Sequence, residues 1–212
     1  MQRHSRIAVA LLAPALLAAL ILVLVLGGPS GSSTSQTTAA PAANVSSGFD
    51  GAALPASAPA PDFTLRDQDG RSLSLSELHG KVVIVAFLYS TCGATCILIA
   101  QQIRGALDEL EEATPVLFIS ADPAADTPAN VKRFLEEVSL TGRVLYLTGP
   151  LSLLRPIWHA YRITPASAGG AAFDRFASVL LLDAKGRRRV LFEPEQLTPE
   201  GLAHDVRKLA GG

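Results

Sequence analysis

The stretch "KVVIVAFLYSTCGATC", residues 81–96, decides the fold class of this chain. Its first part, Lys81 to Tyr89, is almost wholly apolar and rich in β-branched side chains, which is typical of a strand buried on both faces. Its second part carries Cys92 and Cys96, the 2 cysteines of the chain, where a helix is expected to begin. Because ligands and reactive groups gather at the carboxyl ends of strands in open α/β sheets, this junction is the expected site.

The elements on either side of this stretch predict an α/β domain with a mixed central sheet. Apolar residues at helical spacing, with caps of the Thr-Pro type, predict four helices. Runs of β-branched residues predict further strands, and Asp69-Gly70 is a turn pair between two of them. The expected helices span residues 94–112, 126–138, 152–163 and 198–210, and the expected strands lie within 61–78, 81–89, 115–120, 143–148 and 177–192.

The N-terminal part of the chain predicts a membrane anchor. Residues 7–26, "IAVALLAPALLAALILVLVL", carry no charge, and roughly 20 apolar residues can cross a bilayer core of about 30 Å. Arg3 and Arg6 precede this segment, and the next basic residue is Arg66. The positive-inside bias therefore places residues 1–6 in the cytoplasm and the later residues outside, as in a single-pass protein of the cell membrane. A cleaved signal sequence is the alternative interpretation of the same segment.

The rest of the chain divides into a linker and one domain. Residues 27–59 are rich in Gly, Ser, Thr, Ala and Pro, which is typical of a flexible tether, although "FDGAALP" (residues 49–55) could dock on the domain. Residues 60–212 are long enough for one domain with its own core. A net charge of −1 and a pI near 6.4 give no sign of nucleic-acid binding.

The spacing of Cys92 and Cys96 allows three chemical states. Residues four apart on a helix share a face, with Cα atoms about 6 Å apart, which is within disulfide range. The helix N-terminus favours the thiolate, and two thiolates suit a soft ion such as Cu(I). A static disulfide, or two cysteines that merely fill the core, is the alternative. A bridge over so short a loop would stabilise the domain little, so we expect a redox-active or copper-binding pair.

Four stretches together give the chain a family resemblance. It resembles the Sco/SenC family, which implies a thioredoxin-like fold outside the membrane. The resemblance further implies copper bound by Cys92, Cys96 and a histidine, and a role in assembling the copper centre of cytochrome c oxidase. The partner would be the copper-bearing oxidase subunit or another thiol protein. The matching stretches are residues 60–96, "SADPAADTPANVKRFL" (120–135), "LTGPLSLLRPIWHAYRI" (147–163) and "SVLLLDAKGR" (178–187).

The chain departs from the family pattern at the third copper ligand. Counting back from Asp183, the position of the family's histidine is Arg175, whose guanidinium cannot bind a metal. The resemblance then implies Cys92 and Cys96 as the copper ligands, with Cu(I) favoured over Cu(II), or no copper at all. Arg175 is either a cation that favours the Cys92 or Cys96 thiolate or a surface residue of a Gly-rich loop. His159 is the remaining candidate ligand, although its aromatic-rich helix is more typical of packing.

Other functions compete with this interpretation. In "SADPAADTP" the carboxylates are expected to serve turns and caps, with Asp126 or Thr127 capping the helix that follows. A peroxiredoxin-like thiol peroxidase would place a proline ahead of the cysteine, where this chain has Ser90 and Thr91. A general thiol–disulfide reductase would carry CxxC rather than CxxxC. Whether the domain is a thiol–disulfide oxidoreductase or a copper chaperone stays open at this point.

Overall fold

The computed structural model describes residues 47–55, 58–168 and 170–211. The expected anchor at residues 7–26 and most of the expected linker lie outside these ranges. Within them, no helix is both long and apolar enough to span a bilayer. The described chain forms an α/β domain with a six-stranded sheet and a separate two-stranded hairpin.

The strands are β1 (Ala52–Ala53), β2 (Thr64–Arg66), β3 (Ser72–Ser74), β4 (Val83–Leu88), β5 (Val116–Ser120), β6 (Leu145–Leu147), β7 (Val179–Leu182) and β8 (Arg188–Phe192). The α-helices are α2 (Ala94–Glu109), α3 (Pro128–Glu137), α4 (Leu151–Tyr161), α5 (Gly170–Phe176) and α6 (Pro199–Ala210), and two short 3₁₀ turns occupy Leu75–Leu78 and Ala166–Ala168. The sheet order is β1-β8-β7-β4-β5-β6. β4, β5 and β6 run parallel, whereas β7, β8 and β1 pair antiparallel, so the predicted mixed sheet is confirmed.

β4 is the central strand, and all of its side chains are buried. It pairs with β5 on one side and with β7 on the other, which satisfies its backbone hydrogen bonds within the sheet. Because side chains alternate along a strand, Ile84, Ala86 and Leu88 face one core and Val83, Val85 and Phe87 face the other. The continuous apolar run in the sequence therefore reflects burial on both faces, as predicted.

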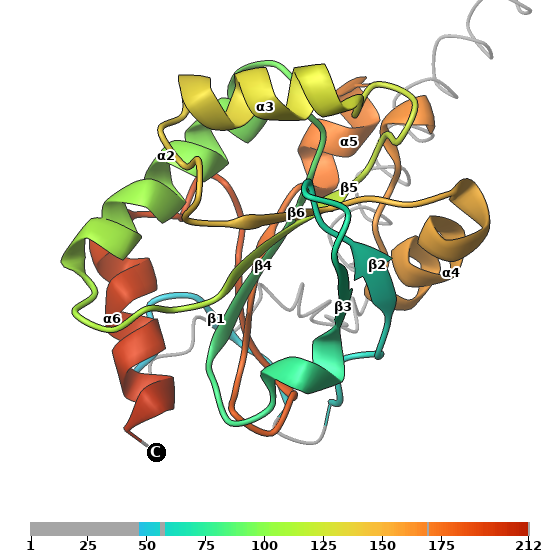
Figure 1. The fold of residues 1–212 in the computed structure, drawn as a ribbon. Coiled ribbons are helices and arrows are strands. Elements are labelled where there is room, and N and C mark those ends of the chain that lie inside the picture. Colours follow the sequence, from blue (N-terminus) through green and yellow to red (C-terminus); the bar gives the residue numbers. More distant parts are fainter. Residues whose placement is uncertain (1–46, 56–57, 169, 212) are drawn as a thin grey trace, which may run out of the picture. The chain divides into compact units, whose positions relative to one another are not determined.

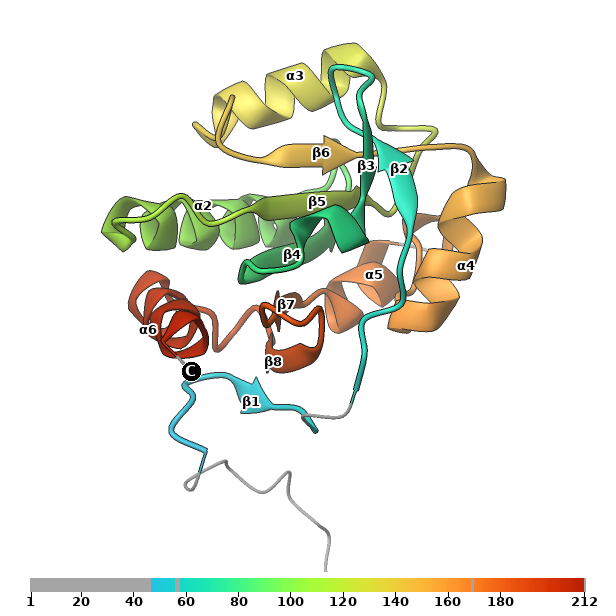
Figure 2. The same ribbon diagram turned by 60° about the horizontal axis from the view of Figure 1, so that its bottom comes forward.

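Helices cover the two faces of the sheet unequally. α2, α3, α5 and α6 pack on the face of Ile84, whereas α4 and the β2–β3 hairpin pack on the face of Val83. Figures 1 and 2 show α2 and α6 side by side and well apart from α4. This division matters for the site, because both cysteines belong to the α2 face.

The sheet also takes in residues that precede residue 60, where the sequence placed the start of the domain. β1 pairs with β8, with Ala52 opposite Leu191. The carboxylate of Asp205, fully buried on α6, accepts hydrogen bonds from the backbone N–H groups of Asp50 and Gly51 at 2.9–3.1 Å. The "FDGAALP" segment therefore docks on α6 and β8, which confirms the prediction that it could dock on the domain.

α5 occupies residues that the sequence assigned to a Gly-rich loop. Its Phe173 is 1% exposed and packs edge-on against Tyr89 at a ring-centroid distance of 5.1 Å. A short glycine-containing segment has weak helix propensity, so packing of this aromatic pair, rather than propensity, accounts for the helix. The loop interpretation was wrong for this reason, and α5 lies beside the strand end that leads to Cys92.

Candidate redox and metal site

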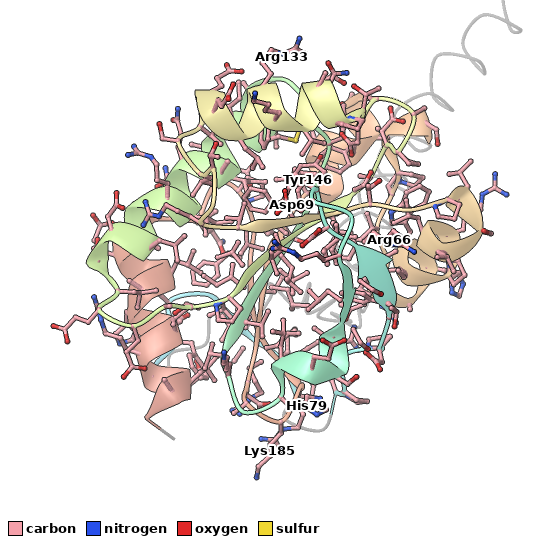
Figure 3. All side chains as sticks on the ribbon, in the orientation of Figure 1. Arg66, Asp69, His79, Arg133, Tyr146 and Lys185 are labelled. Carbon is pink, nitrogen blue, oxygen red and sulfur yellow. A yellow bond between two sulfur atoms is a disulfide. The ribbon has the colours of Figure 1, made fainter. Side chains whose placement is uncertain are left out.

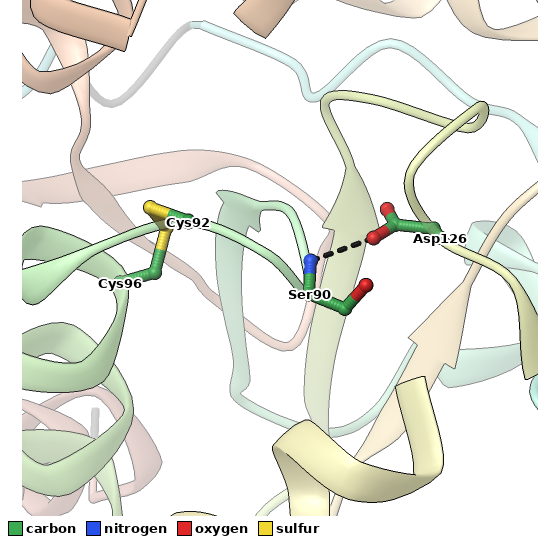
Figure 4. The surroundings of a disulfide bond; sticks show 4 residues. All are labelled: Ser90, Cys92, Cys96 and Asp126. Atoms are coloured by element: carbon green, nitrogen blue, oxygen red, sulfur yellow. Dashed lines mark hydrogen bonds between the residues drawn. A yellow bond between two sulfur atoms is a disulfide. The ribbon is translucent and has the colours of Figure 1, made fainter. Parts of the chain in front are cut away.

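The two cysteines lie where β4 passes into α2. The backbone N–H of Cys92 donates to the Tyr89 carbonyl at 3.0 Å, which closes a tight turn after the strand. Gly93 caps α2, so Cys96 falls in the first turn of that helix. The two residues are joined by a disulfide with a Cα–Cα distance of 5.7 Å (Figure 4). This matches the separation expected from the one-turn spacing.

The two sulfur-bearing residues differ in access. Cys92 keeps 7% of its surface exposed, whereas Cys96 is fully buried and packs with Ile99 and Ala100 of α2 in the core. Cys92 also precedes the helix, where unpaired N–H groups and the helix dipole favour a thiolate. We therefore predict that an external thiol reaches Cys92 before Cys96.

Asp126 reaches the same loop from the β5–α3 connection. One carboxylate oxygen, Oδ1, accepts from the Ser90 backbone N–H at 2.6 Å (Figure 4). The other, Oδ2, accepts from Ser120 Oγ at 2.5 Å. Burial raises the pKa of this carboxyl, and the hydrogen bonds from Ser120 and Ser90 partly oppose that rise. The Thr127 side chain accepts the Asn130 N–H and caps α3, so the predicted cap at Asp126 or Thr127 is confirmed and is Thr127.

Two aromatic side chains line the interior next to this carboxylate. Trp158 donates its indole N–H to the Ser120 carbonyl at 2.9 Å, which ties α4 to the end of β5. The hydroxyl of Tyr146 is buried without a hydrogen-bond partner at bonding distance, and Figure 3 shows this residue within the body of the domain. Burial, with the nearby charge of Asp126, raises the Tyr146 pKa well above its ordinary value. No local sequence pattern indicates the Asp126–Ser120 pair, because the two residues meet only in the folded chain.

The positions considered for a third copper ligand lie in helices on opposite faces of the sheet. The backbone of Arg175 lies in the helix α5 rather than in a loop. Phe173 of the same helix packs against Tyr89. His159 is exposed in the last turn of α4, which packs on the opposite face of the sheet from α2. His79 is exposed just before β4, at the other end of that strand from Cys92 (Figure 3). Arg175 has no lone pair to offer a metal, so a third ligand from His159 is the prediction that stays to be tested.

Among the described residues, one other group could converge on a metal ion. Asp50, His204 and Asp205 each offer a ligand atom, and these atoms lie within 4.8 Å of one another. The Asp205 carboxylate already accepts the Asp50 and Gly51 N–H groups, and His204 Nδ1 lies 2.9 Å from it. These contacts hold the docked N-terminal segment to α6, so we assign the group a structural role.

Comparison with protein families decides the affiliation of the chain. A family model described as SCO1/SenC matches residues 52–211, which is nearly all of the described domain. The chain belongs to the SCO1/SenC family. The Sco/SenC resemblance noted from the sequence motifs is thereby confirmed.

Individual relatives and solved structures agree on the fold. Chloroplastic peroxiredoxin Q of Oryza sativa subsp. japonica is 38% identical over 76 residues, which cover 35% of each chain, so this chain spans about a third of that curated relative. Apo Sco1 of Thermus thermophilus superposes with a TM-score of 0.62 at 21% identity, over 76% of this chain and 96% of that one. Copper-bound ScoI of Bradyrhizobium japonicum has a TM-score of 0.55 at 26% identity, over 72% and 99%. The predicted thioredoxin-like fold is confirmed.

The unequal access of the two cysteines makes a kinetic prediction. Cys96→Ser leaves the Cys92 thiol, and Cys92→Ser leaves the Cys96 thiol. We expect the Cys96→Ser variant to form a mixed disulfide with oxidised glutathione at least about tenfold faster than the Cys92→Ser variant does. The remaining Cys92 thiol is the less buried of the two and precedes a helix, which favours its thiolate. Mass spectrometry of quenched samples follows the reaction. Equal rates, or a faster Cys92→Ser variant, would contradict the assignment of Cys92 as the entry sulfur.

Proposed function

We propose that this domain handles copper and exchanges thiols with disulfides, through Cys92 and Cys96, in assembly of the cytochrome c oxidase copper centre. The observation that carries the proposal is a disulfide-bonded, one-turn cysteine pair at the start of α2, in which Cys92 keeps 7% of its surface exposed and Cys96 none. Membership of the SCO1/SenC family supports it, as does the copper bound to the related Bradyrhizobium japonicum ScoI. The copper-bearing oxidase subunit, or another thiol protein, is the proposed partner.

The pair can supply either electrons or ligands. As a reductant, the Cys92 thiolate attacks a partner disulfide and forms a mixed disulfide with one partner sulfur. Cys96 then attacks Cys92 Sγ, releases the partner as a dithiol, and leaves the Cys92–Cys96 disulfide, so two electrons pass to the partner. As a copper carrier, the reduced pair offers two thiolates to Cu(I), a soft ion that suits sulfur ligands. Both roles need the same two sulfurs, so copper loading and oxidation exclude each other.

A thiol peroxidase is the second candidate, because of the identity with peroxiredoxin Q. The segment ahead of Cys92 has Ser90 and Thr91 but lacks the proline that shapes the peroxide pocket of peroxiredoxins. Our proposal therefore expects the reduced protein to react faster with a disulfide substrate than with hydrogen peroxide. Rapid peroxide consumption with turnover would favour the peroxidase instead.

We further propose that residues 7–26 anchor the protein in the cell membrane, with the domain outside the cytoplasm. The uncharged segment and the basic residues Arg3 and Arg6 before it support this arrangement. A C-terminal reporter that is active only outside the cytoplasm should be active on the full chain. Activity from a cytoplasmic reporter alone would contradict the proposed topology, and release of a shortened soluble protein would show a cleaved signal sequence.

The arginine at the position of the family's histidine makes a prediction about copper oxidation states. We expect the wild type to hold Cu(II) poorly, because two thiolates without an imidazole suit Cu(I), and Cu(II) prefers a tetragonal site with nitrogen ligands. Arg175→His should add an imidazole and create a coloured Cu(II)–thiolate band, whereas Arg175→Gln, which removes the charge alone, should not. Absorption titrations of the three proteins measure this. If the wild type already gives that band and Arg175→His leaves it unchanged, the alignment of position 175 is wrong and His159 is the next ligand to test.

A further inference from the structure

Two kinds of contact hold the loop between β4 and Cys92. The first is the local turn from the Cys92 N–H to the Tyr89 carbonyl. The second crosses to the β5–α3 connection, where Asp126 accepts from the Ser90 N–H at 2.6 Å and Ser90 Oγ donates to the Ala125 carbonyl at 3.3 Å. Only the Asp126 carboxylate also binds the end of β5, through Ser120 Oγ. This carboxylate therefore links the carboxyl ends of the two parallel strands next to the cysteines.

Besides these hydrogen bonds, the Asp126 carboxylate lies near the buried Tyr146 hydroxyl, whose pKa its charge helps to raise. It is 5% exposed, and the ion pairs found within the described residues do not include it. Burying a carboxylate costs free energy unless its hydrogen bonds compensate. Capping of α3 does not require it, because Thr127 caps that helix. One of its hydrogen bonds instead holds the Ser90 backbone N–H, two positions before Cys92, and the other ties the carboxylate to Ser120 at the end of β5.

We propose that Asp126 is a positioning residue that holds Cys92 at bonding distance from Cys96. This inference rests on the proposed function and extends it to a residue outside the cysteine pair. Because Cys96 is fixed by its burial in α2, the separation of the sulfurs depends on the loop that carries Cys92. A loop held in place by Asp126 raises the effective concentration of one sulfur at the other, as positioned groups do in intramolecular reactions.

The effective concentration sets a measurable redox equilibrium. The reduced protein and oxidised glutathione give the Cys92–Cys96 disulfide and two reduced glutathione molecules. Two protein S–H bonds and the glutathione S–S bond break, one protein S–S bond and two glutathione S–H bonds form, and two electrons pass to glutathione. Loss of the clamp should lower this equilibrium constant. The same loss should weaken Cu(I) binding, because a chelate also needs both sulfurs close together.

The Cu(I) measurement separates positioning from a purely electrostatic role. A nearby buried anion would disfavour thiolates and the net negative Cu(I)–dithiolate complex. If charge were the whole effect, removing Asp126 would strengthen Cu(I) binding. If positioning dominates, removing Asp126 weakens both Cu(I) binding and disulfide formation. The two accounts thus predict opposite signs for Cu(I) affinity.

The experiment compares the wild type with Asp126→Ala, Asp126→Asn, Ser120→Ala and Ser90→Ala. Ser90→Ala keeps the backbone N–H that Asp126 accepts at 2.6 Å and removes only the longer 3.3 Å contact from the Ser90 hydroxyl to the Ala125 carbonyl, so it measures the contribution of that weaker contact to the loop. Each reduced protein is equilibrated with glutathione buffers and titrated with Cu(I) against a chromophoric chelator. Thermal unfolding followed by circular dichroism checks that each variant is folded.

For Asp126→Ala we expect about a tenfold smaller equilibrium constant, equivalent to a potential about 30 mV less negative, and about tenfold weaker Cu(I) binding. Asp126→Asn, whose amide oxygen can still accept the Ser90 N–H, should lose less, about threefold. Ser90→Ala should stay within about twofold of the wild type. If Asp126→Ala does not fold, Ser120→Ala carries the test, with about a threefold loss in both measurements.

Two results would overturn the positioning role of Asp126 while leaving the proposed function intact. One is a folded Asp126→Ala variant with the wild-type equilibrium constant and Cu(I) affinity. The other is any folded Asp126 variant that binds Cu(I) more tightly than the wild type. If Asp126→Ala does not fold, wild-type values for Ser120→Ala would overturn it. A wild type that neither exchanges with glutathione nor binds Cu(I) would overturn the proposed function, and this inference with it.

Discussion

The burial of β4 on both faces is the constraint on which the rest of the domain depends. None of its side chains from Val83 to Leu88 is more than 2% exposed, and its backbone pairs with β5 and β7. A strand so enclosed cannot shift in register without moving apolar side chains to the wrong core. The chain therefore leaves the sheet after Leu88, and the turn that begins at Tyr89 places Cys92 just before the start of α2.

The sequence predicted those parts whose local pattern and tertiary environment agree. The apolar run of β4, the Thr-Pro starts of α3 and α6, and the one-turn cysteine spacing each carry their signal in consecutive residues. α5 was missed because its helix depends on Phe173 packing against Tyr89, a contact between residues far apart in the sequence. β1 was anticipated only as a segment able to dock, since two residues paired to β8 have no periodicity to detect.

Asp126 shows why half of the site could not be predicted. An aspartate before Thr-Pro is a good helix cap by local chemistry, and the neighbouring threonine performs that role equally well. Asp126 does not cap α3 because its carboxylate accepts hydrogen bonds from Ser90 and Ser120 instead. These two residues lie at the ends of different strands and come together only in the folded sheet. The cysteines, by contrast, were identifiable because their chemistry and spacing are local. The site thus combines a cysteine pair close in sequence with a carboxylate from a distant segment that ties the strand ends together.

We propose that one cysteine pair, Cys92 and Cys96, serves both thiol–disulfide exchange and copper binding. The most direct test titrates the purified domain with Cu(I) in its dithiol and disulfide forms and measures bound copper and its coordination by X-ray absorption. We expect one Cu(I) held by two sulfurs in the dithiol form and no Cu(I)–sulfur coordination in the disulfide form. Equal binding by both forms, or copper held without sulfur, would contradict it.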